Sequence, residues 1–261
     1  MDLGLRDRVY LVTGATRGLG FATARALVDD GARVVVTGRG EENVAKAAAE
    51  LGGAPNAIGV AADNADSGTA ERLVAATVSR FGRIDGVLVS VGGPPAGTVM
   101  GTDDDQWRDG FESVFLGAVR LARAAANAMG DRGAQGPDGE GVIGFVLSMS
   151  VRQPIGGLAV SNGLRPGLAM AAKTLADELG PHGIRVVGLL PARIDTDRVR
   201  ELDALSGDAA AARARQEQSI PLGRYGTPEE FGRVAAFLLS PAASYVTGTM
   251  VPLDGGAMRG L

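Results

Sequence analysis

Short apolar runs recur along the chain and alternate with segments of helical periodicity. Between most runs, apolar residues at i, i+3 and i+4 predict amphipathic helices, as in Ala22–Val28 and Ala70–Phe81. Continuous apolar strands that alternate with helices are typical of a parallel sheet covered on both faces. The pattern therefore predicts an α/β fold, a doubly wound parallel sheet (Rossmann fold) of about seven strands. The predicted strands are Val9–Thr13, Arg33–Thr37, Ala57–Ala61, Gly86–Ser90, Val142–Leu147, Arg185–Leu190 and Met250–Leu253.

No linker divides this pattern, so we expect a single domain over residues 1–261. The polar, glycine-rich segment Gly130–Gly141 predicts an exposed loop between a long helix and the fifth strand. The polar, alanine-rich run Asp195–Ser219 follows the sixth strand and has helical character. Its position predicts a small helical lid over a ligand crevice.

Composition excludes several classes of function. Acidic and basic residues are mixed along the chain, the net charge is −4, and no basic stripe indicates a nucleic-acid partner. There is no cysteine and only one histidine, His182, which excludes disulfides and thiolate or multi-histidine metal sites, so we expect no metal. We find no signal peptide and no apolar run of membrane-spanning length. The expectation is a soluble cytoplasmic protein without a membrane partner.

A glycine-rich turn joins the first strand to the first helix in the stretch "LVTGATRGLGFATARAL". Gly14, Gly18 and Gly20 permit a tight turn and let the backbone approach a pyrophosphate. The helix that follows offers N–H donors and the positive end of its dipole. Glycines also serve plain strand–helix turns. Here they follow the first strand of an alternating pattern, which favours dinucleotide binding.

Motifs over nearly the whole length resemble the short-chain dehydrogenase/reductase family. "TGATRGLG" has the family's Gly-x-x-x-Gly-x-Gly spacing, and "LVSVGGPPAG" resembles its Asn-Asn-Ala-Gly segment. "ELGPHGIRVVGLLPARIDT" resembles the segment that leads to a Pro-Gly turn, with Ala192 in place of the glycine. "IPLGRYGTPEEFGRVAAFLLSPAASYVTGTMVPLDGG" resembles the family's C-terminal segment. The resemblance implies a Rossmann-fold oxidoreductase that uses a nicotinamide cofactor.

The resemblance also implies which nicotinamide cofactor is bound and where. Members that prefer NAD usually have an acid at the end of the second strand, where this chain has Thr37 followed by Gly38 and Arg39. Arg17 lies within the glycine loop, and two guanidinium groups near the ribose suit a 2′-phosphate. We therefore favour NADP(H) over NAD(H); the alternative is that both arginines are simply solvated. The predicted cofactor-binding residues are Gly14, Thr16, Arg17, Gly18, Leu19, Gly20, Arg39, Asp63, Asn64, Ser90, Gly92, Arg165, Pro191, Ile194 and Thr196.

The catalytic motif of the family is altered. In the family a tyrosine exchanges a proton with the substrate oxygen, and a lysine four residues later lowers the tyrosine's pKa and holds the ribose. Aligning "LADELGPHGIRV" places Ser161 at the tyrosine position and Arg165 at the lysine position. Aligning "FLGAVRLARAAA" places Val114 at the position of an asparagine that supports a proton-relay water. The family's serine, which binds the substrate oxygen, corresponds to Ser150 by strand register or to Ser148 by its separation from the tyrosine position. Residues i and i+2 of a strand share a face, so both hydroxyls are candidates.

No other tyrosine and lysine replace this pair. Of the three tyrosines, only Tyr225 could approach the crevice, and its position normally serves packing. Lys173 is two helical turns beyond Arg165. His182 precedes the sixth strand, at the far end of the sheet, and is expected to be a surface residue.

Ser161 and Arg165 are four residues apart and would share one face of a helix. Arg165 could hold the ribose hydroxyls and polarise a carbonyl, while Ser161 would be a weak proton donor. In the alternative interpretation the segment is a plain helix start. Ser161 is then the N-cap, Pro166 lies in the first turn and Arg165 is a surface residue.

The sequence thus predicts an NADP(H)-dependent oxidoreductase with a non-standard active site. By resemblance it would reduce a carbonyl of a small molecule, 3-oxoacyl- or ketone-like, or oxidise the alcohol. The alternative is a catalytically inactive NADP(H)-binding sensor or assembly partner. The resemblance also implies a homo-oligomer, a dimer or tetramer, formed through the alanine-rich helices that contain Leu121–Met129 and Gly167–Ala176.

Overall fold

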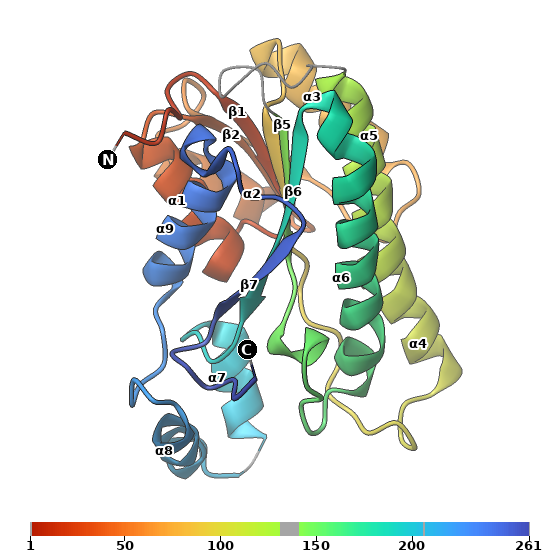
Figure 1. The fold of residues 1–261 in the computed structure, drawn as a ribbon, viewed down its shortest axis with the longest axis vertical. Coiled ribbons are helices and arrows are strands. Elements are labelled where there is room, and N and C mark those ends of the chain that lie inside the picture. Colours follow the sequence, from red (N-terminus) through yellow and green to blue (C-terminus); the bar gives the residue numbers. More distant parts are fainter. Residues whose placement is uncertain (1, 131–140, 206, 261) are drawn as a thin grey trace.

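A seven-stranded parallel sheet forms the centre of the computed structural model, which describes residues 2–130, 141–205 and 207–260. The strand order is β3-β2-β1-β4-β5-β6-β7, and every neighbouring pair is parallel. This confirms the predicted doubly wound α/β fold (Figure 1). The strands are β1 (Val9–Val12), β2 (Arg33–Gly38), β3 (Ala57–Ala61), β4 (Gly86–Val89), β5 (Gly141–Val146), β6 (Ile184–Pro191) and β7 (Thr249–Leu253).

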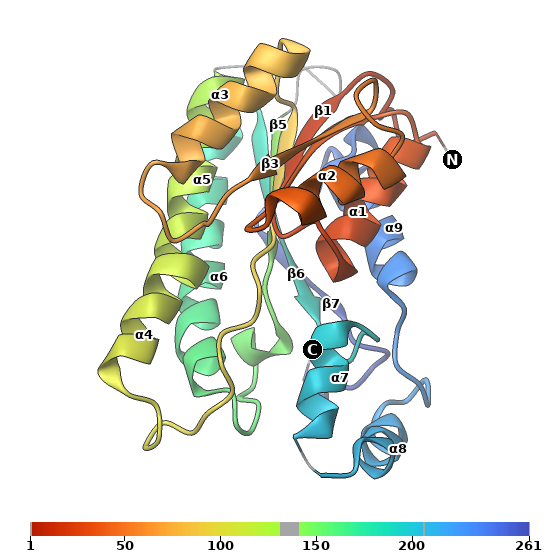
Figure 2. The same cartoon turned by 180° about the vertical axis from the view of Figure 1, so that it is seen from behind.

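Helices cover both faces of the sheet (Figures 1 and 2). One face packs against α1 (Gly18–Asp29), α2 (Glu41–Glu50) and α9 (Pro228–Leu239), and the other against α3 (Thr69–Phe81), α5 (Gly117–Met129) and α6 (Ala159–Leu179). Successive residues of a strand point to opposite faces, so Tyr10 and Leu11 of β1 are buried in two different cores. The apolar strands are therefore hydrophobic on both sides, as the sequence pattern required.

The long helix before β5 is not regular. It begins with α4 (Asp104–Gly110), which Asp103 caps together with Gln106, and passes through a π-helical segment, η1 (Phe111–Leu116), into α5. A Cβ atom on Gly117 would lie 2.1 Å from the carbonyl oxygen of Asn64, so only glycine lets this turn approach the end of β3. Val114 is buried in the π-helical segment.

The predicted lid consists of two helices, α7 (Asp197–Ala204) and α8 (Ala209–Ser219), beyond the carboxyl end of β6. Thr196 and Asp208 cap them with side-chain oxygens. Figure 2 shows both helices below the carboxyl ends of the strands, away from the two helical layers. A short 3-10 helix, η3 (Gly180–His182), precedes β6, and η4 (Pro241–Ala243) follows α9.

Most predicted strand limits differ from the observed ones by one residue. Thr13 and Ser90, expected to end the first and fourth strands, lie just beyond β1 and β4. The expected Gly130–Gly141 loop falls, apart from its two end residues, outside the described part of the chain. Among the described residues, none of the helices combines the length and apolar character needed to span a bilayer.

Candidate active site

A cleft of about 1550 Å³ follows the carboxyl ends of the strands. It passes the gap between β1 and β4, where the strand order reverses direction along the sheet. Open α/β sheets bind ligands at this switch point, because the loops that follow the two strands diverge there. Single small-molecule pockets usually measure about 300–1,000 Å³. The volume of this cleft therefore exceeds that of a pocket for a single small molecule.

The glycine loop lies close to the backbone of β4. Gly14 has φ +56°, and a Cβ atom there would lie 2.5 Å from the carbonyl oxygen of Ser90. A Cβ atom on Gly20 would lie 2.5 Å from the carbonyl oxygen of Gly14. Both positions therefore require glycine, and the turn that they permit directs the N-terminus of α1 into the cleft. This backbone cradle fits a pyrophosphate.

Thr13 fixes the loops that follow β1 and β4 relative to each other. Its hydroxyl donates to the carbonyl oxygen of Ser90 at 2.8 Å and accepts from the Ser90 N–H at 2.9 Å. These two side-chain hydrogen bonds replace the next backbone hydrogen bond between β1 and β4. Both residues therefore lie past the strand ends. Thr13 is not among the predicted site residues; its signal in the sequence is a threonine directly before Gly14.

All the predicted cofactor-binding residues line this one cleft. They are Gly14, Thr16, Arg17, Gly18, Leu19, Gly20, Arg39, Asp63, Asn64, Ser90, Gly92, Arg165, Pro191, Ile194 and Thr196. Pro191 ends β6, and the others lie in the loops and helices that follow the first six strands, which parallel pairing brings to the same edge of the sheet.

The two arginines that the sequence predicts near the cofactor ribose differ in their contacts. Arg17 is the N-cap residue of α1, and its Nη1 lies 3.0 Å from Oδ2 of Asp197 on α7. Arg39 is exposed at the end of β2, next to the buried Thr37. Both guanidinium groups line the cleft, and the acid expected for NAD binding is replaced by a threonine.

Ser161 is the third residue of α6, and Arg165 lies one turn further along the helix. The helix begins at Ala159 with Leu158 as its N-cap residue, so Pro166 is an interior residue. Only 5% of the surface of Ser161 and of Arg165 is exposed, and both residues line the cleft. The alternative interpretation, with Ser161 as the N-cap and Arg165 on the surface, is therefore wrong.

Arg165 is held by the end of β5. Its Nη1 donates to the carbonyl oxygen of Val146 at 2.7 Å. Burial lowers the pKa of Arg165 to about 10, which leaves the guanidinium protonated at neutral pH. Burial is also the only influence on this pKa, so no nearby carboxylate of the described residues offsets the cost of the buried charge. The result is a buried cation at the wall of the cleft.

The two candidate serines occupy different places. Both follow the end of β5, and Ser148 caps the 3-10 helix η2 (Met149–Val151), to which Ser150 belongs. The expectation that they share a strand face is wrong, because the chain leaves the strand at Val146. Ser148 lines the cleft and accepts the Ser150 N–H at 3.1 Å. Ser150 is buried behind it, with its Oγ 3.2 Å from Oγ of Ser161.

Asn162, which follows Ser161, positions the loop before α6. Its side chain accepts the N–H of Ile155 at 3.0 Å and donates to the carbonyl oxygen of Ile155 at 2.8 Å. Ile155 lines the cleft, so Asn162 shapes the wall without facing the reacting end.

The other residues considered for proton transfer lie outside the cleft. Tyr225 donates to Oδ2 of Asp203 at 2.9 Å, and burial, followed by this hydrogen bond, raises its pKa to about 12. Lys173 pairs with Asp177 on the exposed side of α6. His182 is exposed in η3, before β6.

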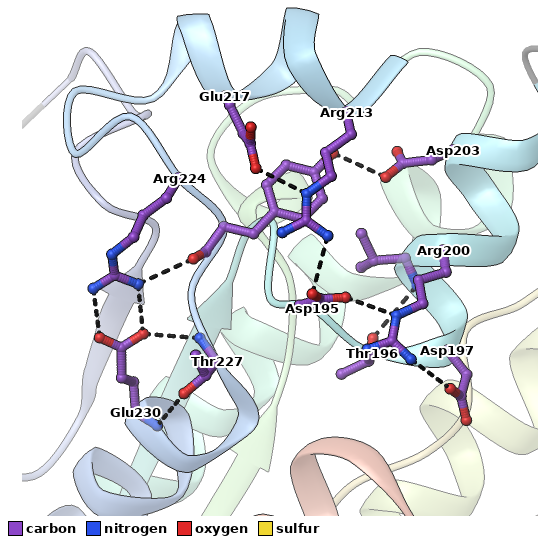
Figure 3. A network of polar contacts seen from close by, with 12 residues as sticks. Asp195, Thr196, Asp197, Arg200, Asp203, Arg213, Glu217, Arg224, Thr227 and Glu230 are labelled. Carbon is purple, nitrogen blue, oxygen red and sulfur yellow. Dashed lines mark hydrogen bonds and ion pairs between the residues drawn. The ribbon is translucent and has the colours of Figure 1, made fainter. Parts of the chain in front are cut away.

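An ionic network fixes the base of the lid (Figure 3). Asp195 accepts from Arg213 of α8 at 3.0 Å and from Arg200 of α7 at 2.8 Å. These two hydrogen bonds, chiefly the one from Arg213, lower the pKa of Asp195. Arg200 also lies 3.3 Å from Asp197. The network ties α7 and α8 to the segment after β6.

Two neighbouring residues of α7, absent from the sequence-based site, reach two other loops. Asp197 pairs with Arg17 of the glycine loop, and Arg198 donates to the carbonyl oxygen of Pro94 after β4 at 2.7 Å. Their only signal in the sequence was that they directly follow Thr196. Within the described residues, no group of three or more acidic or histidine side chains could hold a metal ion.

Comparison with known proteins agrees with this geometry. A family model described as enoyl-(acyl carrier protein) reductase matches residues 14–258. The L-rhamnose 1-dehydrogenase (NAD(P)(+)) of Azotobacter vinelandii is 33% identical over 97% of both chains. The short-chain reductase protein NovJ of Streptomyces niveus is 35% identical over 96% of this chain and 94% of its own.

Solved structures show the same likeness. The L-sorbose reductase of Gluconobacter frateurii, determined in complex with NADPH and L-sorbose, superposes with a TM-score of 0.92 at 29% identity and covers both chains completely. The similarity in sequence and structure thus extends over the glycine loop, the cleft and the C-terminal segment. The chain belongs to the short-chain dehydrogenase/reductase family of oxidoreductases.

Proposed function

We propose that this protein is an NADP(H)-dependent oxidoreductase that interconverts a carbonyl and an alcohol on a small, ketone- or 3-oxoacyl-like substrate. In this proposal its active site is non-standard, with Ser161 and Arg165 at the positions of the family's tyrosine and lysine. The observation that carries the proposal is one continuous cleft. The glycine loop lines one end, and the Ser161–Arg165 pair lines the wall at the other end.

Three features support NADP(H) as the cofactor. Arg17 and Arg39 line the proposed adenosine end of the cleft, and Thr37 stands at the end of β2 in place of a carboxylate that would repel a 2′-phosphate. The L-sorbose reductase was solved with NADPH. The name of the L-rhamnose dehydrogenase allows either cofactor, so the choice depends on this chain's own arginines.

The mechanism follows from the groups at the reacting end. A bound nicotinamide supplies or accepts the hydride. Arg165 would donate to the ribose hydroxyls, and its buried positive charge would stabilise negative charge that develops on the substrate oxygen. Ser148, which lines the cleft, would donate a hydrogen bond to that oxygen, with Ser150 as the alternative. Ser161 is too weak an acid to replace a tyrosine, so the proton would come from water.

A second candidate is a nucleotide-binding sensor or assembly partner without turnover. It is favoured by the side chains at positions 161 and 165, because Ser161 is too weak an acid and the Arg165 guanidinium stays protonated at neutral pH. It is also favoured by Tyr225 and Lys173, which are engaged elsewhere. Under this reading the cofactor cleft serves binding alone.

The two candidates are separated by binding and turnover measured together. NADPH and NADH are titrated by cofactor fluorescence, and aldehydes, ketones and 3-oxoacyl thioesters are then assayed. Tighter binding of NADPH with slow turnover of at least one carbonyl class supports the oxidoreductase. Tight binding without turnover across the panel supports the sensor, and the absence of dinucleotide binding contradicts both.

A double variant tests the altered pair directly. Ser161→Tyr with Arg165→Lys would supply the family's acid and its neighbour, and general acid catalysis contributes about a hundredfold or more. The matched control, Ser161→Ala with Arg165→Ala, should lower turnover. If the double variant folds, binds NADPH and gains no rate, the proposed positions of Ser161 and Arg165 in the mechanism are wrong.

We also propose that the protein is a cytoplasmic homo-oligomer, a dimer or tetramer. The side of the molecule formed by η1, α5 and α6 exposes apolar side chains, with Phe111 42% and Met170 69% exposed. Phe111 stacks on Phe115, with ring centroids 5.3 Å apart. Light scattering tests the assembly, and a monomeric mass contradicts it; cell fractionation tests the location.

A further inference from the structure

Asp197, a carboxylate of the lid, forms an ion pair with Arg17, the arginine that we assign to the cofactor's 2′-phosphate. Oδ2 of Asp197 lies 3.0 Å from Nη1 of Arg17, and both side chains line the cleft. We propose that Asp197 is a cofactor-specificity residue that competes with a 2′-phosphate for Arg17 and so lowers the affinity for NADP(H) without affecting NAD(H). This inference rests on the proposed role of Arg17 in binding NADP(H).

The two residues meet because the start of α7 lies against the glycine loop. A Cβ atom on Gly18 would be 3.6 Å from the Cγ2 methyl of Thr196, the residue before Asp197. Arg17 is the N-cap residue of α1, with extended backbone (φ −164°, ψ 176°) and no side-chain cap bond. The start of α1 and the start of α7 thus lie close together, which places the Asp197 carboxylate beside the Arg17 guanidinium.

The contact can exchange with a ligand. The side chains of Arg17 and Asp197 are 71% and 49% exposed, and exposed ion pairs of this kind contribute little stability. A phosphate group can accept two parallel hydrogen bonds from the guanidinium, and it is then a stronger partner than one carboxylate oxygen. We therefore expect a 2′-phosphate to displace Asp197 from Arg17.

Asp197 keeps a partner when it leaves Arg17. Its other oxygen, Oδ1, lies 3.3 Å from Nη1 of Arg200. Asp197 is also the first residue of α7, where a negative charge is favoured by the helix dipole. A displaced Asp197 would therefore stay close to the bound phosphate. The repulsion between the two anions is the physical source of the proposed penalty, which NAD(H), with a hydroxyl at that position, does not incur.

Other contacts hold the lid in place without Asp197. Arg198 donates to the carbonyl oxygen of Pro94, and Asp195 accepts from both Arg200 and Arg213. The side chain of Thr196 caps α7 through the N–H of Val199. Removing the charge of Asp197 should therefore change the electrostatics at Arg17 and leave the position of α7 unchanged.

The test compares two nucleotides that differ in the 2′-phosphate. Adenosine 2′,5′-bisphosphate and ADP are titrated into the wild type, Asp197→Asn and Asp177→Asn by calorimetry at low salt. Asp177→Asn is the matched control, because it removes a carboxylate from a surface ion pair with Lys173 that does not line the cleft. Asp197→Asn should bind the bisphosphate about two- to fivefold more tightly, the range expected for one exposed charge pair. Its affinity for ADP should stay the same, and the gain should shrink at high salt.

Two results overturn the proposal. An equal loss of affinity for both nucleotides would mean that Asp197 supports the lid, and no change for either would mean that it does not compete. The variant Arg17→Gln distinguishes a failure of this inference from a failure of the proposed function. If Arg17→Gln leaves bisphosphate binding unchanged, Arg17 does not bind the 2′-phosphate and the inference fails with that assignment. If it weakens bisphosphate binding, the gain from Asp197→Asn should disappear in the Arg17→Gln, Asp197→Asn double variant.

Discussion

Replacing Arg165 by methionine should separate ligand binding from stability. Methionine is unbranched and uncharged, so it can fill the space of the aliphatic part of a side chain that is 5% exposed. The substitution removes the hydrogen bond from Nη1 to the carbonyl oxygen of Val146 and the buried positive charge. These two losses have opposite effects on the free energy of unfolding.

The magnitudes nearly cancel. Burial lowers the pKa of Arg165 from its ordinary value to about 10. Because the unfolded chain binds this proton more tightly, the charge costs stability at every pH below 10, and the cost is relieved only as the pH rises above 10. The difference corresponds to about 3 kcal/mol at pH 7. A hydrogen bond from a charged donor stabilises by about 1.5–3 kcal/mol. The net change in stability should therefore lie within about 1.5 kcal/mol of zero.

For a chain of this length, about 1 kcal/mol shifts Tm by about 2–4 °C. We expect Arg165→Met to melt within about 6 °C of the wild type and to bind NADPH at least about tenfold more weakly, because the donors to the ribose are lost. Thermal unfolding at pH 7 measures the first quantity and fluorescence titration of NADPH the second.

Arg185→Met is the matched control. Arg185 is equally buried, but it donates to the carbonyl oxygens of Leu238, Ser240 and Val246, and so closes the end of α9. Its loss should lower Tm far more than the loss of Arg165, and its position away from the cleft predicts unchanged NADPH affinity in protein that folds. If Arg165→Met instead melts as low as this control and still binds NADPH normally, Arg165 is a structural residue and the reasoning fails.

Two further variants test the glycine loop and the base of the lid. Gly14→Ala should weaken NADPH binding and lower the urea midpoint more than Gly53→Ala. Both glycines have positive φ, but only at Gly14 would a Cβ atom meet the carbonyl oxygen of Ser90; equal effects would refute the close-approach argument. Tyr225→Phe should cost about 1 kcal/mol at pH 7 through the lost hydrogen bond to Asp203. The raised pKa of Tyr225, about 12, gives the wild type stability that is complete below about pH 10 and lost between pH 10 and 12. Unfolding by urea at pH 9 and at pH 11 should show a smaller drop in the phenylalanine variant, and an equal drop would contradict this assignment.

The end of the cleft formed by the glycine loop was predictable from the sequence because its geometry is built into the chain. The glycine spacing dictates a turn that only glycine permits, as Gly14 and Gly20 show. Parallel strands then bring the residues that follow each strand to one edge, so a strand pattern alone places them together. The error of one residue at Thr13 and Ser90 has a local cause, since a side-chain hydroxyl replaces the strand ladder there.

The part of the cleft beside the end of β5 and the start of α6 was less predictable because local irregular structure decides it. The 3-10 turn after β5 separates Ser148 from Ser150, and an alternating pattern of apolar residues carries no signal for such a turn. Pro166 favoured a helix start nearby, yet the helix begins seven residues earlier, at Ala159. The contacts from α7 to Arg17 and Pro94 depend on the tertiary position of the lid, which no local pattern encodes.

A comparison of two of the buried arginines, Arg185 and Arg165, shows which of these features concerns function. Arg185 donates to three backbone carbonyls, so packing explains both its burial and its charge. Arg165 donates to Val146, and no carboxylate of the described residues offsets its desolvation. A buried cation without a paired anion lowers the stability of the fold. Its presence is therefore explained better by ligand binding than by folding. Because Arg165 lines the cleft, its remaining N–H donors can bind a ligand with hydroxyl or anionic oxygens. In the proposed mechanism this preorganised charge would stabilise the reacting oxygen without further desolvation.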